Sequence, residues 1–145
     1  MSAVGPRVRR SLLVLCCAAA CAWGVAGCSD SGVGKLVRVV GKVTVNGKPL
    51  ANGSVSFRPD QAKGNTSVYE PAGDIDAGTY ELYTATRQGA PPGWYKVLVV
   101  SAEPGVYPPK KLYADAKYAD LATSGLNIEV VDNAPEGHYD LKLTN

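Results

Sequence analysis

Apolar residues recur at every second position in several short segments of this chain, and this period of two restricts the fold more than any other feature. In residues 36–45 (LVRVVGKVTV), four valines share one face with a glycine, and charged or hydroxyl side chains take the other. The first face holds Val37, Val39, Gly41, Val43 and Val45, and the second holds Arg38, Lys42 and Thr44. Because successive side chains of a strand point to opposite faces, the pattern predicts a half-buried strand.

The same alternation continues along the chain. It is found in residues 54–58, 79–84, 94–100, 126–131 and 139–143, and a weaker segment lies around residues 66–75. Asn46-Gly47 is a dipeptide preferred in type I′ hairpin turns. Helical spacing is not sustained over roughly ten residues anywhere, although residues 111–122 could form one or two turns. The sequence therefore predicts an all-β domain, a seven-stranded antiparallel β-sandwich of the immunoglobulin-like kind.

The N-terminal segment has a different character. Residues 1–10 contain three arginines and no acid, and residues 11–27 contain no charged side chain. A basic start, an apolar run and small residues at a cleavage point are typical of a secretory signal peptide. The uncharged run is shorter than the roughly 20 residues of a membrane-spanning helix. We predict a signal peptide over residues 1–27, and a retained single membrane span is the alternative.

The end of this leader carries a short motif. The tetrapeptide Val25-Ala26-Gly27-Cys28 resembles the lipobox of bacterial lipoproteins. The resemblance implies cleavage between Gly27 and Cys28, a diacylglyceryl group on the Cys28 thiol and acylation of the new amine. Two or more acyl chains anchor a protein stably without a spanning helix. The expected organisation is a signal peptide (1–27), a lipidated cysteine with a flexible tether (28–35) and a β-sandwich domain (36–145).

Processing would change both the cysteine content and the charge. Three of the four cysteines, Cys16, Cys17 and Cys21, lie in the leader, and Cys28 would be consumed by the lipid. No thiol would remain for a disulfide, a nucleophile or a metal. The 15 basic and 13 acidic residues become 12 and 13 when three arginines leave, a net charge of −1. Such a balance gives no reason to expect nucleic acid binding.

Four motifs in the remaining chain resemble one family. They are VGKVTVNGKPL (40–50), GDIDAGTYEL (73–82), GAPPGWYKV (89–97) and KYADLATSGL (117–126). The first three are similar to the opening hairpin, the Asp-rich turn and the Gly/Pro turn of carboxypeptidase regulatory-like, transthyretin-like domains. The fourth is similar to a segment of small lipoproteins from planctomycete-type bacteria. The resemblance covers residues 37–143 and implies a prealbumin-like seven-stranded sandwich at the cell envelope; it does not imply an enzyme.

Candidate metal and catalytic residues are few. Asp74 and Asp76, close to Glu70, resemble part of an oxygen-ligand calcium loop, but Asp-Ala-Gly is also ordinary turn chemistry. Calcium binding therefore stays open beside a structural turn. His138 is the only histidine, and Ser124 has no other base to call upon. We expect no enzyme, no metal and no cofactor.

Exposed aromatic residues are the remaining candidates for recognition. The alternation places Tyr83 and Trp94 outward, and three tyrosines fall in the long segment 103–124: Tyr107, Tyr113 and Tyr118. Trp94, Tyr107, Tyr113 and Tyr118 form the candidate recognition surface. The alternative is that the segment folds over the sheet and buries its own tyrosines.

These observations lead to one expected role and one rival. We expect a lipid-anchored, exported module of the bacterial cell envelope that binds another envelope protein or is structural. The rival is a carbohydrate-binding module that uses exposed aromatics to contact polysaccharide. Ser29 rather than aspartate after Cys28 favours the outer membrane by the enterobacterial sorting pattern.

Overall fold

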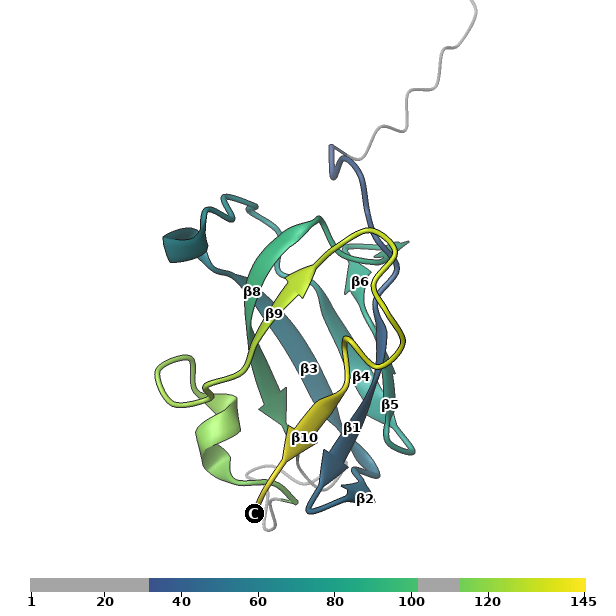
Figure 1. Ribbon diagram of the computed structural model, residues 1–145, viewed down its shortest axis with the longest axis vertical. Helices are drawn as coiled ribbons and strands as arrows, with labels where there is room; N and C mark the ends of the chain where they lie inside the picture. Colours follow the sequence, from purple (N-terminus) through teal and green to yellow (C-terminus); the bar gives the residue numbers. More distant parts are fainter. Residues whose placement is uncertain (1–31, 102–112) are drawn as a thin grey trace, which may run out of the picture. The chain divides into compact units, whose positions relative to one another are not determined.

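The computed structural model describes residues 32–101 and 113–145, which form ten strands and two short 3-10 helices (Figure 1). The strands are β1 (Val40–Val45), β2 (Lys48–Pro49), β3 (Asn52–Pro59), β4 (Ala72–Asp76), β5 (Thr79–Glu81), β6 (Tyr83–Thr84), β7 (Arg87–Gln88), β8 (Gly93–Val100), β9 (Asn127–Val130) and β10 (Leu141–Leu143). The 3-10 helices are η1 (Gln61–Lys63) and η2 (Ala116–Ala119). The all-β prediction is confirmed.

The strands join into one curled sheet. Its main path runs β10-β1-β5-β4-β3-β8-β9, and β2, β6 and β7 are two-residue additions paired to this path or to each other. Neighbouring strands are antiparallel, except that β10 pairs with β1 in parallel, with Val43 opposite Leu141 and Val45 opposite Leu143. In Figure 1 this pair brings the first long strand and the last strand of the chain side by side.

The hydrophobic core lies on the inner side of the curl. Alternation in β1 is as predicted, because Val39, Val43 and Val45 are buried and Lys42 is exposed. Strands β3 and β8 contribute Val55, Phe57, Tyr95, Val97 and Val99. The Phe57 ring centroid lies 5.6 Å from that of Tyr95 and 6.4 Å from that of Tyr80. Apolar side chains on facing parts of one sheet thus exclude water from a shared core.

The structure differs from the prediction where a segment bends. The expected strand 79–84 is divided into β5 and β6 at Leu82, which is fully buried. The Leu82 backbone N–H donates to the Val39 carbonyl, and the Leu82 carbonyl accepts from Gly89. The weaker segment around 66–75 becomes a strand only from Ala72. Within the described residues, no helix has the length and apolar character needed to cross a membrane.

One close contact holds the turn that precedes β10 to β5. The buried Tyr80 hydroxyl donates a 2.7 Å hydrogen bond to the Tyr139 carbonyl. Gly41, opposite Tyr80 in the β1–β5 ladder, leaves the space for this arrangement. A Cβ atom on Gly41 would lie 2.3 Å from the Tyr139 oxygen and 2.7 Å from a Tyr80 ring carbon. Only glycine allows the three segments to approach so closely.

Candidate functional site

The face of the sheet turned away from the core, here called the outer face, carries exposed apolar side chains. Val40, Tyr83 and Val100 are 42%, 45% and 44% exposed, which is high for residues of their kind on strands. Tyr83 and Val100 belong to two neighbouring cross-strand rows. One row is Tyr83, Ala72, Ser56 and Leu98, and the next is Asp74, Ser54 and Val100. Val40 lies opposite Glu81 in the β1–β5 ladder of the same sheet, so the three apolar residues share its outer face.

A shallow groove of about 430 Å³ runs across this outer face. Its lining comes from β3, β4, β5 and β6: Ser54, Ala72, Gly73, Asp74, Glu81 and Tyr83. Gly73 forms part of the floor, and a Cβ atom there would lie 2.0 Å from the Glu81 carbonyl oxygen. The absence of a side chain at Gly73 therefore allows β4 and β5 to approach each other beneath the groove.

Glu81 organises one wall of the groove. Its Oε1 accepts hydrogen bonds from Arg38 Nε at 2.9 Å and Gln88 Nε2 at 2.6 Å, and its Oε2 accepts from the Tyr83 hydroxyl at 3.4 Å. The hydrogen bond from Arg38 and then that from Gln88 hold the pKa of Glu81 below its usual value. An ionised Glu81 thus fixes the end of the Tyr83 side chain while the ring faces solvent.

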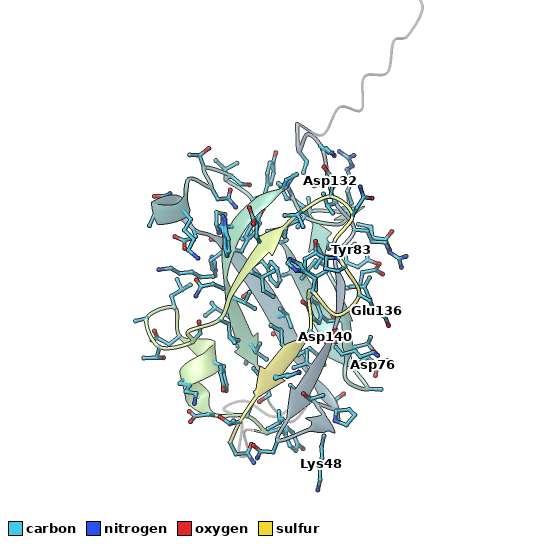
Figure 2. The ribbon with its side chains drawn as sticks, in the orientation of Figure 1. Lys48, Asp76, Tyr83, Asp132, Glu136 and Asp140 are labelled. Atoms are coloured by element: carbon cyan, nitrogen blue, oxygen red, sulfur yellow. The ribbon has the colours of Figure 1, made fainter. Side chains whose placement is uncertain are left out.

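Two further carboxylates line the same face. Asp74 and Asp76 are exposed and alternate with the buried Ile75 on β4. Figure 2 labels Asp76 and Tyr83 on the same side of the domain. In the described part of the chain, neither aspartate forms an ion pair, and no three His, Cys, Asp or Glu side chains are grouped to hold a metal ion. The tight turn is made by Ala77 and Gly78, both with positive φ, and Asp74 lies within the strand.

Trp94, a predicted recognition residue, lies beside a second hollow of about 380 Å³. Its side chain is half-buried on β8, and the Lys63 ammonium nitrogen lies 3.8 Å from the ring centroid. Asn65 Nδ2 donates to the Trp94 carbonyl at 2.9 Å. Asn65, Thr66, Ser67 and Glu129 make the rest of the lining polar. One aromatic ring with polar neighbours is chemistry that suits a polar ligand such as a sugar.

The other predicted aromatics are not gathered around Trp94. Tyr118 does not belong to an exposed recognition surface, because its side chain is only 6% exposed and lies in the core; the alternative, in which the segment buries its own tyrosines, holds for Tyr118. Asp115 caps η2 by accepting from the Lys117 N–H, and this turn directs Tyr118 to Thr144, whose hydroxyl lies 3.1 Å from the tyrosine hydroxyl. A period-two argument does not apply to such a turn. Tyr113 is half-buried against the core, and Tyr107 lies outside the described residues.

The remaining candidates are placed as follows. Cys28 and Gly27, with the whole leader, also lie outside the described residues. His138 is exposed in a turn, with Nε2 2.8 Å from the Glu129 carbonyl oxygen, and Ser124 is buried. Sequence reasoning missed Glu81, Arg38 and Gln88 as a group. Alternation could indicate that Glu81 and Tyr83 share a face, but no local signal brings Arg38 and Gln88 to them.

Comparisons with known proteins identify no relative: no family model, curated protein or solved structure matches this chain. The candidate site therefore has to be interpreted from its own chemistry.

Proposed function

We propose that this chain is an exported, lipid-anchored module of the bacterial cell envelope that acts by binding another envelope protein, without catalysis. The basic, then apolar leader and the lipobox-like Val25-Ala26-Gly27-Cys28 support the anchor. We further propose that the sheet closes as a seven-stranded transthyretin-like sandwich. The seven strands of the main path and the resemblance of residues 37–143 support this finer description.

The observation that carries the binding role is the outer face. Exposed Tyr83, Val40 and Val100 give it an apolar centre, and aromatic residues of this kind dominate the energetics of protein interfaces. Asp74, Asp76 and Glu81 carry negative charge on this face, and Arg38 and Lys42 on the same face carry positive charge. The partner surface that fits is aliphatic, with charges of both signs at its rim and a cation opposite Asp74.

The test is crosslinking in cells with the tagged full chain, followed by mass spectrometry of the captured protein. Tyr83→Ala should lower affinity for that protein about 30-fold, the consequence of losing roughly 2 kcal/mol at an interface anchor. Asp74→Asn should slow association and reduce its dependence on salt. Leu121→Ala is the matched control, since Leu121 is equally exposed in a turn outside the sheet. Equal capture by Tyr83→Ala and the parent chain would refute this site.

The anchor has its own test. The intact mass of the mature chain should correspond to a protein that begins at Cys28 and carries acyl groups. Cys28→Ser should leave an uncleaved or soluble species. A Cys28→Ser variant that is cleaved and still partitions entirely into detergent would contradict the lipoprotein assignment.

The Trp94 hollow favours a second candidate function, carbohydrate binding. At this hollow of about 380 Å³, the Trp94 ring can stack on a sugar. The Thr66 hydroxyl and the Glu129 carboxylate beside it can accept hydrogen bonds from the sugar hydroxyl groups. Retention on envelope polysaccharide that is lost in Trp94→Ala and kept in Tyr83→Ala would establish this function. The opposite pattern, with protein capture lost only in Tyr83→Ala, would establish the first.

A further inference from the structure

The folded body begins close to the proposed anchor. Val33 is only 6% exposed, and Val37 pairs with Ala90 by two backbone hydrogen bonds of 2.9 Å. The tether expected from the sequence reached residue 35, but burial of Val33 fixes the chain to the domain earlier. Only four residues, 29–32, separate Cys28 from this fixed point in the sequence.

The length of this connection limits where the domain can be. Five residues of fully extended chain span at most about 18 Å. A lipid on Cys28 would therefore hold Val33 within about 18 Å of the boundary between acyl chains and headgroups. This distance is comparable to the thickness of the headgroup layer plus a few water molecules. This step rests on the proposed lipid anchor.

Two contacts and one close approach identify the surface that surrounds this point, here called the tether end. The Tyr69 side chain approaches Gly32, since a Cβ atom added there would lie 3.7 Å from the Tyr69 hydroxyl. Arg87 Nη1 donates to the Gly34 carbonyl at 3.5 Å, and Lys35 Nζ lies 2.5 Å from an Asp132 carboxylate oxygen. Figure 2 shows Asp132 at one end of the domain and Lys48 at the opposite end.

The tether end also presents the most exposed large apolar residue in the described part of the chain. Val68, adjacent to Tyr69, is 86% exposed, whereas the other exposed large apolar residues reach at most 46%. Tyr69 follows it in the chain, and the tether end also carries the cationic side chains of Lys35, which pairs with Asp132, and Arg87. A protruding aliphatic group, a tyrosine and cations are the residue types that favour the membrane interface.

We propose that the tether end is a membrane-contact surface. The bilayer that holds the lipid of Cys28 is its occupant: Val68 and Tyr69 enter the headgroup layer, and Arg87 faces lipid phosphates, whereas Lys35 stays paired with Asp132. The short connection gives the domain one preferred orientation, with the hairpin of β1 and β2 that carries Lys48 directed away from the bilayer. The Trp94 hollow, lined by Ser67 next to Val68, then opens near the headgroups.

The absence of a free thiol after lipidation of Cys28 makes this orientation measurable. Val68→Cys and Lys48→Cys each introduce one labelling site at an exposed position, one at each end of the domain. The lipidated variants, labelled with an environment-sensitive fluorophore, are reconstituted into phosphatidylethanolamine–phosphatidylglycerol vesicles that contain a headgroup-proximal nitroxide lipid. Quenching at residue 68 should exceed quenching at residue 48 several-fold.

The outcomes separate the two proposals. Equal quenching at both positions, or stronger quenching at residue 48, overturns the membrane-contact surface while the anchor stands. A mature chain whose intact mass shows no acyl group on Cys28 overturns the anchor and this inference together. If quenching is stronger at residue 68, the double variant Val68→Cys/Tyr69→Ser tests the role of Tyr69. Weaker quenching in the double variant than in Val68→Cys alone assigns part of the contact to the Tyr69 side chain.

Discussion

Gly41→Ala should be among the most destabilising single-methyl changes in this protein. The new carbon would lie 2.3 Å from the Tyr139 carbonyl oxygen, about 1 Å closer than an ordinary carbon–oxygen contact of roughly 3.3 Å. A backbone carbonyl cannot rotate aside as a flexible side chain can, so β10 must move away from β1. That movement also lengthens the 2.7 Å hydrogen bond from Tyr80.

The expected cost follows from these two effects. Overpacking of a core typically costs about 1–3 kcal/mol, and an unsatisfied buried carbonyl costs about 1 kcal/mol or more. Together they remove about 3 kcal/mol of the roughly 5–15 kcal/mol by which such domains are stable. At roughly 4 °C per kcal/mol, the midpoint of thermal unfolding should fall by about 12 °C.

Urea unfolding followed by circular dichroism measures this loss. Gly125→Ala is the control, because Gly125 has positive φ (65°) but no atom within 4 Å of an added Cβ. It should lose only about 1 kcal/mol, from backbone strain alone. If Gly41→Ala is no less stable than Gly125→Ala, the close approach of β1, Tyr80 and Tyr139 is not a constraint on this fold.

Three further predictions concern a turn, a buried phenol and the outer face. Ala77 has φ of 47°, in the left-handed region, so Ala77→Gly should raise the free energy of unfolding by about 0.5–1 kcal/mol; a lower urea midpoint would contradict this. Burial, and then the charge of Asp140, raises the pKa of Tyr80 well above its ordinary value of 10.0, so the fold favours the neutral phenol. The stability that Tyr80 contributes should be complete below pH 10.0 and should fall above it. Tyr80→Phe should lose less stability at alkaline pH than the parent chain, although the loss of the hydrogen bond should lower its free energy of unfolding by about 1 kcal/mol at neutral pH. Arg38→Met removes the largest cause of the lowered pKa of Glu81, so NMR titration of that carboxyl should show a pKa closer to the usual value, and an unchanged pKa would refute the network. Because the pKa of Glu81 in the folded protein is lowered, the stability that Glu81 contributes is lost as the pH falls through that pKa. The Arg38→Met variant should therefore lose less stability than the parent chain as the pH falls.

The sequence predicts strands well where alternation persists. In β1, β3 and β8 the inward residues are those expected, since each strand has one face in the core and one in water. It predicts boundaries less well. Tyr139 was expected in the last strand but precedes it in a turn, and only Leu141–Leu143 pair with β1. Alternation carries no information about which strand will pair with which, so the parallel β1–β10 pair could not be foreseen.

The site depends even more on tertiary contacts. Trp94 was predicted to point outward and is half-buried, and Tyr118 is directed inward by a capped 3-10 turn rather than by strand geometry. The hydrogen bonds to Glu81 come from residues 43 positions before it and seven after it. No pattern of spacing along the chain encodes such a group, because it exists only after β1, β5 and β7 meet.

The pairing of β1 with β10 also determines the order in which the fold can be completed. Val43 acquires its neighbour Leu141 only after synthesis has reached β10, about 5–20 s later at ordinary rates of synthesis. Until then one edge of β1 offers unpaired backbone groups, and a nascent chain lacking β10 remains incompletely closed. The export that we propose would benefit from this delay, because a sheet that closes only when β10 arrives keeps the polypeptide unfolded for longer.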